Sequence, residues 1–192
     1  TMDVTDPASV AAGFDACEEK FGIADIVVSN AGISNVGFAH EQSEEDWFAV
    51  VNTNLVAGYR VAAEGGRRLI AAQQPGCIVN VCSILALVVQ QGLRAYCSSK
   101  AGLVQATKTM AIEWARFGIR VNALAPGYVM TEMNRDYFHS DAGKAFIKKI
   151  PQRRLGDVED LDGPMLLLVS DAGAYMTGSV LVVDGGLSLA GP

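Results

Sequence analysis

The sequence predicts an α/β fold built on a doubly wound parallel sheet. Short apolar runs rich in β-branched residues occur at 23–29, 77–82, 119–124 and 179–183, and longer helical stretches separate them. This alternation is typical of βαβ units, in which a helix connects each strand to the next parallel one. Half of the 192 residues are hydrophobic, which is enough for one substantial core. No repeat or interdomain linker interrupts the pattern, so we expect a single domain over residues 1–192.

The helical stretches are predicted at 6–21, 43–72, 95–117, 141–149 and 158–170. The first opens with Asp6 as its cap and Pro7 in its first turn. Gly65 and Gly66 lie inside the second, where each glycine costs about 1 kcal/mol relative to alanine. We expect either the close approach of another helix, which a neighbouring subunit could supply, or a kink.

Composition excludes several classes of protein. The net charge of −6 is spread along the chain, and positive charge is not concentrated enough for a nucleic-acid surface. The apolar runs are far too short for a membrane span, and the N-terminus has no signal-peptide pattern. Four cysteines lack ligand-like spacing and the two histidines lie far apart, so we expect reduced thiols and no metal site. Together these features predict a soluble cytoplasmic protein.

The most informative pair is Tyr96 and Lys100, which lie four residues apart on one face of a predicted helix. A phenol ordinarily has a pKa of about 10, and an adjacent ammonium lowers that pKa. Tyr96 is therefore a candidate proton donor and acceptor. Ser83 ends a predicted strand thirteen residues earlier, where its hydroxyl could reach the same substrate carbonyl. The alternative for Ser83 is an ordinary turn or cap serine.

These residues, in order, resemble the motifs of the short-chain dehydrogenase/reductase family, and the resemblance covers essentially the whole chain. Ser83 with Tyr96-Cys97-Ser98-Ser99-Lys100 resembles the catalytic segment of the family. Residues 29–32 resemble its NNAG turn, with Ser29 in place of the first asparagine, and residues 47–55 resemble its W-x6-NL stretch, in which Asn54 is the match. Residues 120–131 resemble its PG segment, and residues 177–186 its closing strand.

The resemblance implies a Rossmann-like fold and hydride transfer between NAD or NADP and a ketone or secondary alcohol. Tyr96 would exchange the proton with the substrate oxygen, and Ser83 would hydrogen-bond that oxygen. Lys100 would lower the pKa of Tyr96 and hold the nicotinamide ribose. Asn54 would hold a water that links Lys100 to solvent.

The resemblance also implies a set of cofactor-binding positions. Ordinary turns remain the alternative for residues 30–32 and 126–127, and a solvated acid is the alternative for Asp3. Asp3 and Val4 match the end of a strand beside the adenine. The other positions are Asn30, Ala31, Gly32, Tyr96, Lys100, Pro126, Gly127, Val129 and Thr131.

The chain lacks any match to the family's glycine-rich phosphate turn and to the first βαβαβ segment that carries it. We expect that a preceding segment exists in the whole polypeptide and pairs with the strand at 23–29, whose edge would otherwise be open. The position that distinguishes NAD from NADP would lie in that segment, so either cofactor remains possible.

The substrate is expected to be a small carbonyl or alcohol: a sugar, a polyol or a β-ketoacyl compound. Residues 127–151 look like a substrate-covering loop with short helices. Its candidate pocket walls, which could equally be simple packing, are Tyr128, Met130, Met133, Tyr137 and Phe138. The resemblance implies a homo-oligomer, a dimer or tetramer that pairs the helices at 43–72 and 95–117. A different possibility is a non-catalytic relative that keeps the fold as an interaction module.

Overall fold

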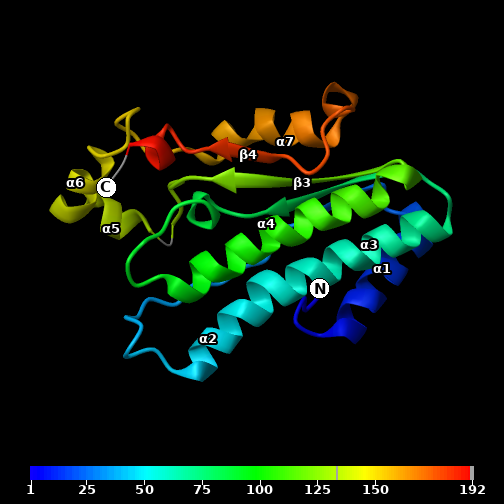
Figure 1. Cartoon of the computed structure of the whole chain (residues 1–192), viewed down its shortest axis with the longest axis horizontal. Coiled ribbons are helices and arrows are strands. Elements are labelled where there is room, and N and C mark those ends of the chain that lie inside the picture. Colours follow the sequence, from blue (N-terminus) through cyan, green and yellow to red (C-terminus); the bar gives the residue numbers. More distant parts are fainter. Residues whose placement is uncertain (133, 191–192) are drawn as a thin grey trace.

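The computed structural model describes residues 1–132 and 134–190, and its centre is one parallel sheet with helices on both faces (Figure 1). The strands are β1 (Ile26–Ser29), β2 (Gly76–Val81), β3 (Ile119–Pro126) and β4 (Val180–Val183). They lie in the order β1-β2-β3-β4, and every neighbouring pair is parallel. The expected α/β fold with a parallel sheet is confirmed.

Seven α-helices in the described residues surround this sheet. They are α1 (Pro7–Phe21), α2 (Glu44–Val51), α3 (Ala57–Ala71), α4 (Arg94–Trp114), α5 (Arg135–His139), α6 (Asp141–Ile147) and α7 (Asp162–Val169). Short 3-10 turns occupy Ile84–Ala86, Ala115–Phe117, Val158–Leu161, Asp171–Gly173 and Leu187–Leu189. Helices α1, α3 and α4 cover one face of the sheet, and α7 lies on the other (Figure 1).

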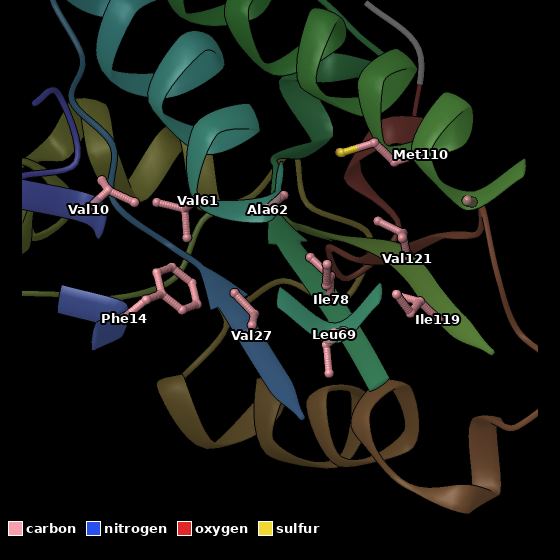
Figure 2. Close-up of a cluster of buried hydrophobic side chains, with 11 residues drawn as sticks. Val10, Phe14, Val27, Val61, Ala62, Leu69, Ile78, Met110, Ile119 and Val121 are labelled. Carbon is pink, nitrogen blue, oxygen red and sulfur yellow. The ribbon is translucent and has the colours of Figure 1, made fainter. Parts of the chain in front are cut away.

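The larger core lies between the sheet and α1, α3 and α4. Figure 2 shows its side chains converging from the three helices and from β1, β2 and β3. Leu69 of α3 and Ile78 of β2 are fully buried there. Burying one such side chain contributes about 1.5–3 kcal/mol, so this layer holds the helices in place. A second core forms around Leu168 of α7, against Cys77, Val79 and Leu124 of the sheet.

The predicted helix at 43–72 is right in extent, but its hydrogen bonding changes midway. Ser43 caps α2 by accepting a hydrogen bond from the Asp46 N–H at 3.1 Å. Residues Asn52–Val56 then form a π-helical turn before α3 begins at Ala57. A π turn inserted in an α-helix often marks a functional site, and Asn54 lies in this one.

The two glycines of α3 mark close packing within the same chain. A Cβ on Gly66 would lie 2.6 Å from the ring of Trp114 in α4, and one on Gly65 would lie 2.8 Å from Val27 of β1. Helix α3 continues unbroken through both positions. Of the two explanations that we left open, close approach of another helix is therefore the correct one.

Strand β1 is an edge of the described sheet, because it pairs with β2 alone. Its side chains alternate between Val27 and Ser29, which are buried toward the helices, and Ile26 and Val28, which are 46% and 42% exposed. Helix α7 packs over β2 and β3.

The segment at 127–151 contains short helices, as expected: α6 corresponds to the helix predicted at 141–149, whereas α5 was not located in advance. The aromatic residues of this segment are mostly packed together. Phe138 is only 3% exposed and forms a cluster with Ile150 and Leu155, against which Tyr128 and Met130 pack. Packing is therefore the role that the structure shows for Tyr128, Met130 and Phe138. Tyr137 is half exposed, and Met133 lies outside the described residues.

All four cysteines are free, and Cys77, Cys82 and Cys97 are buried. No group of three or more metal-ligating side chains occurs among the described residues. Within the same residues, every helix is too short or too polar to cross a membrane.

Candidate active site

Ser83 stands directly after β2, at the carboxyl edge of the sheet. Its Oγ accepts a hydrogen bond from the Leu85 N–H at 3.1 Å and so caps the 3-10 turn Ile84–Ala86. Ser83 also lies near enough to Tyr96 to lower the pKa of its phenol. Ser83 is thus a cap residue, which was the alternative to a catalytic role, and it is also a neighbour of the Tyr96 phenol.

Tyr96 lies in the first turn of α4, and its ring packs against an apolar cluster built on Ile84, Leu85 and Cys97. Burial raises the pKa of Tyr96 above its ordinary value, and the nearby Ser83 hydroxyl opposes that rise only in part. The expectation that Lys100 lowers the pKa of Tyr96 is not met in this structure. The cost of burying a phenolate dominates instead.

Lys100 lies one helical turn beyond Tyr96, as the spacing predicts, and is 3% exposed. Its Nζ donates a hydrogen bond to the carbonyl oxygen of Val81 at 2.8 Å and lies 5.7 Å from the centre of the Tyr96 ring. Burial lowers the pKa of Lys100, and the nearby Cys82 opposes that shift. The ammonium is therefore fixed to the end of β2, beside the phenol.

Asn54 is fully buried in the π-helical turn and joins two parts of the site. Its Oδ1 accepts a hydrogen bond from the Ile33 N–H at 2.8 Å, and its Nδ2 donates to the Ile33 carbonyl oxygen at 2.9 Å and to Ser99 Oγ at 3.1 Å. Asn54 thereby ties the loop after β1 to α4.

Ser99 is a site residue that sequence reasoning missed. Its side chain is fully buried, accepts from Asn54, and donates to the Tyr96 carbonyl oxygen at 2.8 Å. The signal was available, because Ser99 lies inside the segment Tyr96-Cys97-Ser98-Ser99-Lys100.

The predicted turn residues lie at the ends of β1 and β3. A Cβ on Gly32 would lie 3.3 Å from Asn54 Oδ1 and 3.5 Å from Lys100 Nζ, so this backbone touches the centre of the site. A Cβ on Gly127 would lie 2.7 Å from the Asp184 backbone, so only glycine allows β3 and β4 to end so close together.

The remaining predicted positions lie around this centre or apart from it. Asn30 and Ala31 are exposed next to Gly32, and Pro126 ends β3. Val129 forms an isolated parallel bridge with Gly156, and the Thr131 N–H donates to Asn134 Oδ1 at 2.9 Å.

Asp3 and Val4 precede α1, where the Asp3 N–H donates to Ser9 Oγ at 2.9 Å and Val4 packs against the larger core. Asp3 Oδ1 accepts from the Thr5 N–H and hydroxyl at 2.8 and 2.7 Å, and the Val4 carbonyl accepts from Arg60 at 2.7 Å. The hydrogen bonds with Thr5 lower the pKa of the exposed Asp3 carboxyl.

A cavity of about 400 Å³ is lined by one of the predicted cofactor-binding positions, Val129. It opens between β4, Tyr128 and the segment around Arg154 and Asp160. Ser83, Tyr96 and Lys100 do not line it, and the hydrogen-bonded geometry rather than cavity size identifies the candidate site.

The donors present fit the sugar and carboxamide half of the nicotinamide nucleotide that the resemblance implies. A phenol and an ammonium stand beside the exposed backbone of residues 30–32, and Gly32 leaves space against Lys100 that a side chain would fill. Hydroxyl and amide groups of a nucleotide are complementary to such donors.

Comparison with known proteins gives concordant matches along the chain. The family model described as enoyl-(acyl carrier protein) reductase matches residues 1–188. D-threitol dehydrogenase of Mycolicibacterium smegmatis is 37% identical over 187 residues, covering 97% of this chain and 72% of that relative. The 3-oxoacyl-[acyl-carrier-protein] reductase of Chlamydia pneumoniae is 39% identical over 180 residues, covering 92% and 72%.

Solved structures give the same result. Gluconate 5-dehydrogenase from Burkholderia cenocepacia, solved in complex with NADP and tartrate, has a TM-score of 0.92 and 36% identity, covering 98% of this chain and 74% of that one. A short-chain type dehydrogenase/reductase from Mycobacterium marinum has a TM-score of 0.91 and 35% identity, covering 97% and 73%.

Proposed function

Because the chain belongs to the short-chain dehydrogenase/reductase family of NAD(P)-dependent oxidoreductases, we propose that Tyr96, Ser83, Lys100 and Asn54 form its catalytic site. The reaction is hydride transfer between a nicotinamide and a ketone or secondary alcohol. The observation that carries this assignment is the convergence of the Ser83 hydroxyl, the Tyr96 phenol and the Lys100 ammonium at the carboxyl ends of β1 and β2.

The nicotinamide nucleotide, NAD or NADP, would be held by the residues that surround this convergence. Lys100 and Tyr96 would bind the ribose hydroxyls, Asn30, Ala31 and Gly32 would line the ribose through their backbone, and residues 126–131 would contact the carboxamide. Asp3 and Val4 would lie on the adenine side. When bound, the cofactor supplies or accepts the hydride.

Tyr96 moves the proton in this scheme. Its raised pKa keeps the phenol protonated near neutral pH, which is the form that donates a proton to a substrate carbonyl oxygen. Ser83 hydrogen-bonds the same oxygen as negative charge develops there. In the direction of oxidation, Tyr96 removes the alcohol proton instead.

Asn54 and Ser99 position the backbone on both sides of Lys100. By holding Ile33 and the first turn of α4 together, Asn54 keeps Gly32 against the ammonium. A water beside Asn54 would pass the proton from Lys100 to solvent.

The first test replaces the phenol. Tyr96→Phe should lower kcat by about 10²- to 10⁴-fold, which is the usual contribution of a positioned acid–base group. Tyr175→Phe is the matched control, since that ring is fully exposed and should leave kcat unchanged. Initial rates of NADH or NADPH oxidation with a panel of ketones measure both. Equal rates for Tyr96→Phe and wild type would refute the assignment, and no activity from a full-length wild-type preparation would favour an interaction module.

The protein also carries features that support a homo-oligomer in a reducing compartment, the cytoplasm. Large apolar side chains stand exposed on the helices at 44–71 and 94–117, including Phe48, Tyr59 and Ile112. Four free thiols are compatible with a reducing compartment. The net negative charge gives no support to a nucleic-acid partner.

A further inference from the structure

The two loops that flank Tyr96 are apolar over most of their length. One follows β1 at residues 30–38 and the other follows β2 at residues 82–93. Neither segment contains a charged residue. We define the apolar rim as the five exposed hydrophobic side chains of these loops: Ile33, Val36, Phe38, Leu87 and Val89.

Hydrogen bonds and packing place both loops beside the phenol. Asn54 fixes Ile33 on the side of α4, and the Gly37 N–H donates to the Gly92 carbonyl oxygen at 3.0 Å, which joins the two loops. Val88 and Leu93 of the second loop pack in the same apolar cluster as the Tyr96 ring. The rim therefore belongs to two joined loops that lie beside Tyr96.

Exposure of the rim is high for such residues. Val89 is 89% exposed and Val36 is 78% exposed. Apolar side chains gathered at a site mark a surface that binds apolar groups, because contact with a ligand removes them from water.

The cations nearest to the phenol along the chain are already engaged. Lys100 is buried and donates to Val81, and the Arg94 guanidinium donates to the carbonyl oxygens of Ala39 and Gln42. On the loop after β3, Glu132 is exposed and negative. Arg135, in the same segment, is exposed as well. The rim itself consists only of apolar side chains, so a carboxylate placed against it would lose water without gaining a compensating charge.

We propose that the rim selects a neutral carbonyl or alcohol substrate with an apolar chain, such as a keto ester or thioester, over a sugar acid or a polyol. This inference rests on the proposed function for the hydride-transfer reaction and on the rim for the choice of substrate. It separates the substrate classes that the names of the relatives span: a polyol, a sugar acid and an acyl thioester.

The test compares the reduction of ethyl 3-oxohexanoate with that of 3-oxohexanoate, which share the reacting ketone and differ in charge. Oxidation of D-threitol, a neutral polyol, by NAD⁺ or NADP⁺ is measured alongside. We expect kcat/KM for the ester to exceed that for the acid by about tenfold or more, with either NADH or NADPH. Val36→Lys and Val89→Lys should each lower the ratio of ester to acid by about tenfold. Val158→Lys is the control, because that exposed valine lies outside the rim.

Binding without cofactor provides a second readout, by calorimetric titration of the full chain with the ester and with the acid. One outcome is that the ester binds more strongly than the acid, that Val89→Lys weakens ester binding, and that no turnover occurs. This outcome would support the rim and reject the proposed function. Turnover that depends on Tyr96 but favours the acid or the polyol would reject the rim and retain the function. Absence of both binding and turnover would reject the rim as well.

Discussion

Tyr96 shows how burial, rather than the nearest charge, sets the acidity of a side chain. Its ring packs against the cluster of Ile84, Leu85 and Cys97, and Leu187, from a distant segment of the chain, packs against the same cluster. Removing water from a phenol penalises the phenolate, and this penalty exceeds the effect of the Ser83 hydroxyl. The neutral phenol is consequently the resting form.

The raised pKa of Tyr96 makes opposite predictions for the two directions of reaction. Ketone reduction needs the phenol and should stay constant through neutral pH, falling only when the pH passes the raised pKa. Alcohol oxidation needs the phenolate and should rise with pH over the same alkaline range. Rates measured in both directions from about pH 6 to about pH 11 test this, because that range includes the ordinary pKa of a tyrosine phenol, about 10. A reduction rate that already falls at neutral pH would contradict it.

At this scale the sequence predicted the reacting side chains but not their surroundings. Ser83, Tyr96 and Lys100 could be predicted because the spacing between them is visible in the sequence. The partner of Lys100, the carbonyl oxygen of Val81, could not, because every residue carries such an oxygen. The direction of the Tyr96 pKa shift was missed for a related reason: burial depends on which distant segments cover the ring.

Among the elements, α3 is held by close contacts that leave no room for added atoms. Gly66→Ala should lower the free energy of unfolding by about 1–3 kcal/mol, because the new methyl group collides with Trp114. Gly163→Ala in α7 is the control, since a Cβ there meets nothing within 4 Å apart from its chain neighbours. It should change the free energy of unfolding little, because the gain in helix propensity is opposed by Pro164, which follows it. Urea unfolding measures both. Equal effects of the two substitutions would refute the packing argument.

Helices α1 and α3 are also joined by a cluster of ion pairs centred on Arg68. Its guanidinium contacts Glu64 at 2.7 Å, Asp15 at 2.7 Å and Glu18 at 2.9 Å. Burial alone would raise the pKa of Glu64, but hydrogen bonds with Arg68 and Arg67 outweigh it and lower that pKa. The cluster therefore stabilises the ionised carboxylate.

Glu64→Gln should lower the free energy of unfolding by about 1–3 kcal/mol at neutral pH, since one buried charged partner is lost. Because the pKa of Glu64 is lower in the folded state, its contribution is present above the unfolded pKa of about 4.3 and disappears as the pH falls through the folded value. The difference between wild type and variant should shrink accordingly in acid. Glu19→Gln, at an exposed position on α1, is the control and should show no such difference. Thermal unfolding across pH measures both.

The sequence predicted the elements well where periodicity carries the information, and less well where tertiary contacts do. The start of α1 follows from its cap residue, Asp6. The positions of the strands in the sheet follow from the apolar runs. The π-helical turn at 52–56 was not predicted, since hydrophobic spacing does not distinguish it from α-helix. The hydrogen bonds of Asn54 to Ile33 and Ser99, which accompany it, exist only in the folded chain.

For the whole molecule, the exposed apolar residues of α2, α3 and α4 predict self-association. Ile112 is 82% exposed in the middle of α4, so Ile112→Lys should shift the mass found by light scattering toward that of a monomer. Phe21→Lys, which adds the same charge at the end of α1, is the control and should leave the mass unchanged. A wild-type monomer would contradict the prediction.

The fold as a whole could be predicted from the sequence because parallel sheets follow a simple rule. Each buried apolar run becomes a strand, and each helix returns the chain to the edge of the sheet where the strands begin. That rule places the residues following β1, β2 and β3 next to one another, which is where Gly32, Ser83 and Gly127 lie. It does not foresee a cluster such as that of Phe138, Ile150 and Leu155, which forms from an irregular segment.

The π-helical turn between α2 and α3 has a consequence for how the chain tolerates changes of length. A π turn contains about one residue more than an α turn, so the helices before and after it are rotated relative to a continuous α-helix. That offset lets α2 pack on α4 while α3 faces the sheet and α1. Deleting a single residue from 52–56 would restore a regular helix, turn one of these faces toward solvent and carry Asn54 away from Ile33.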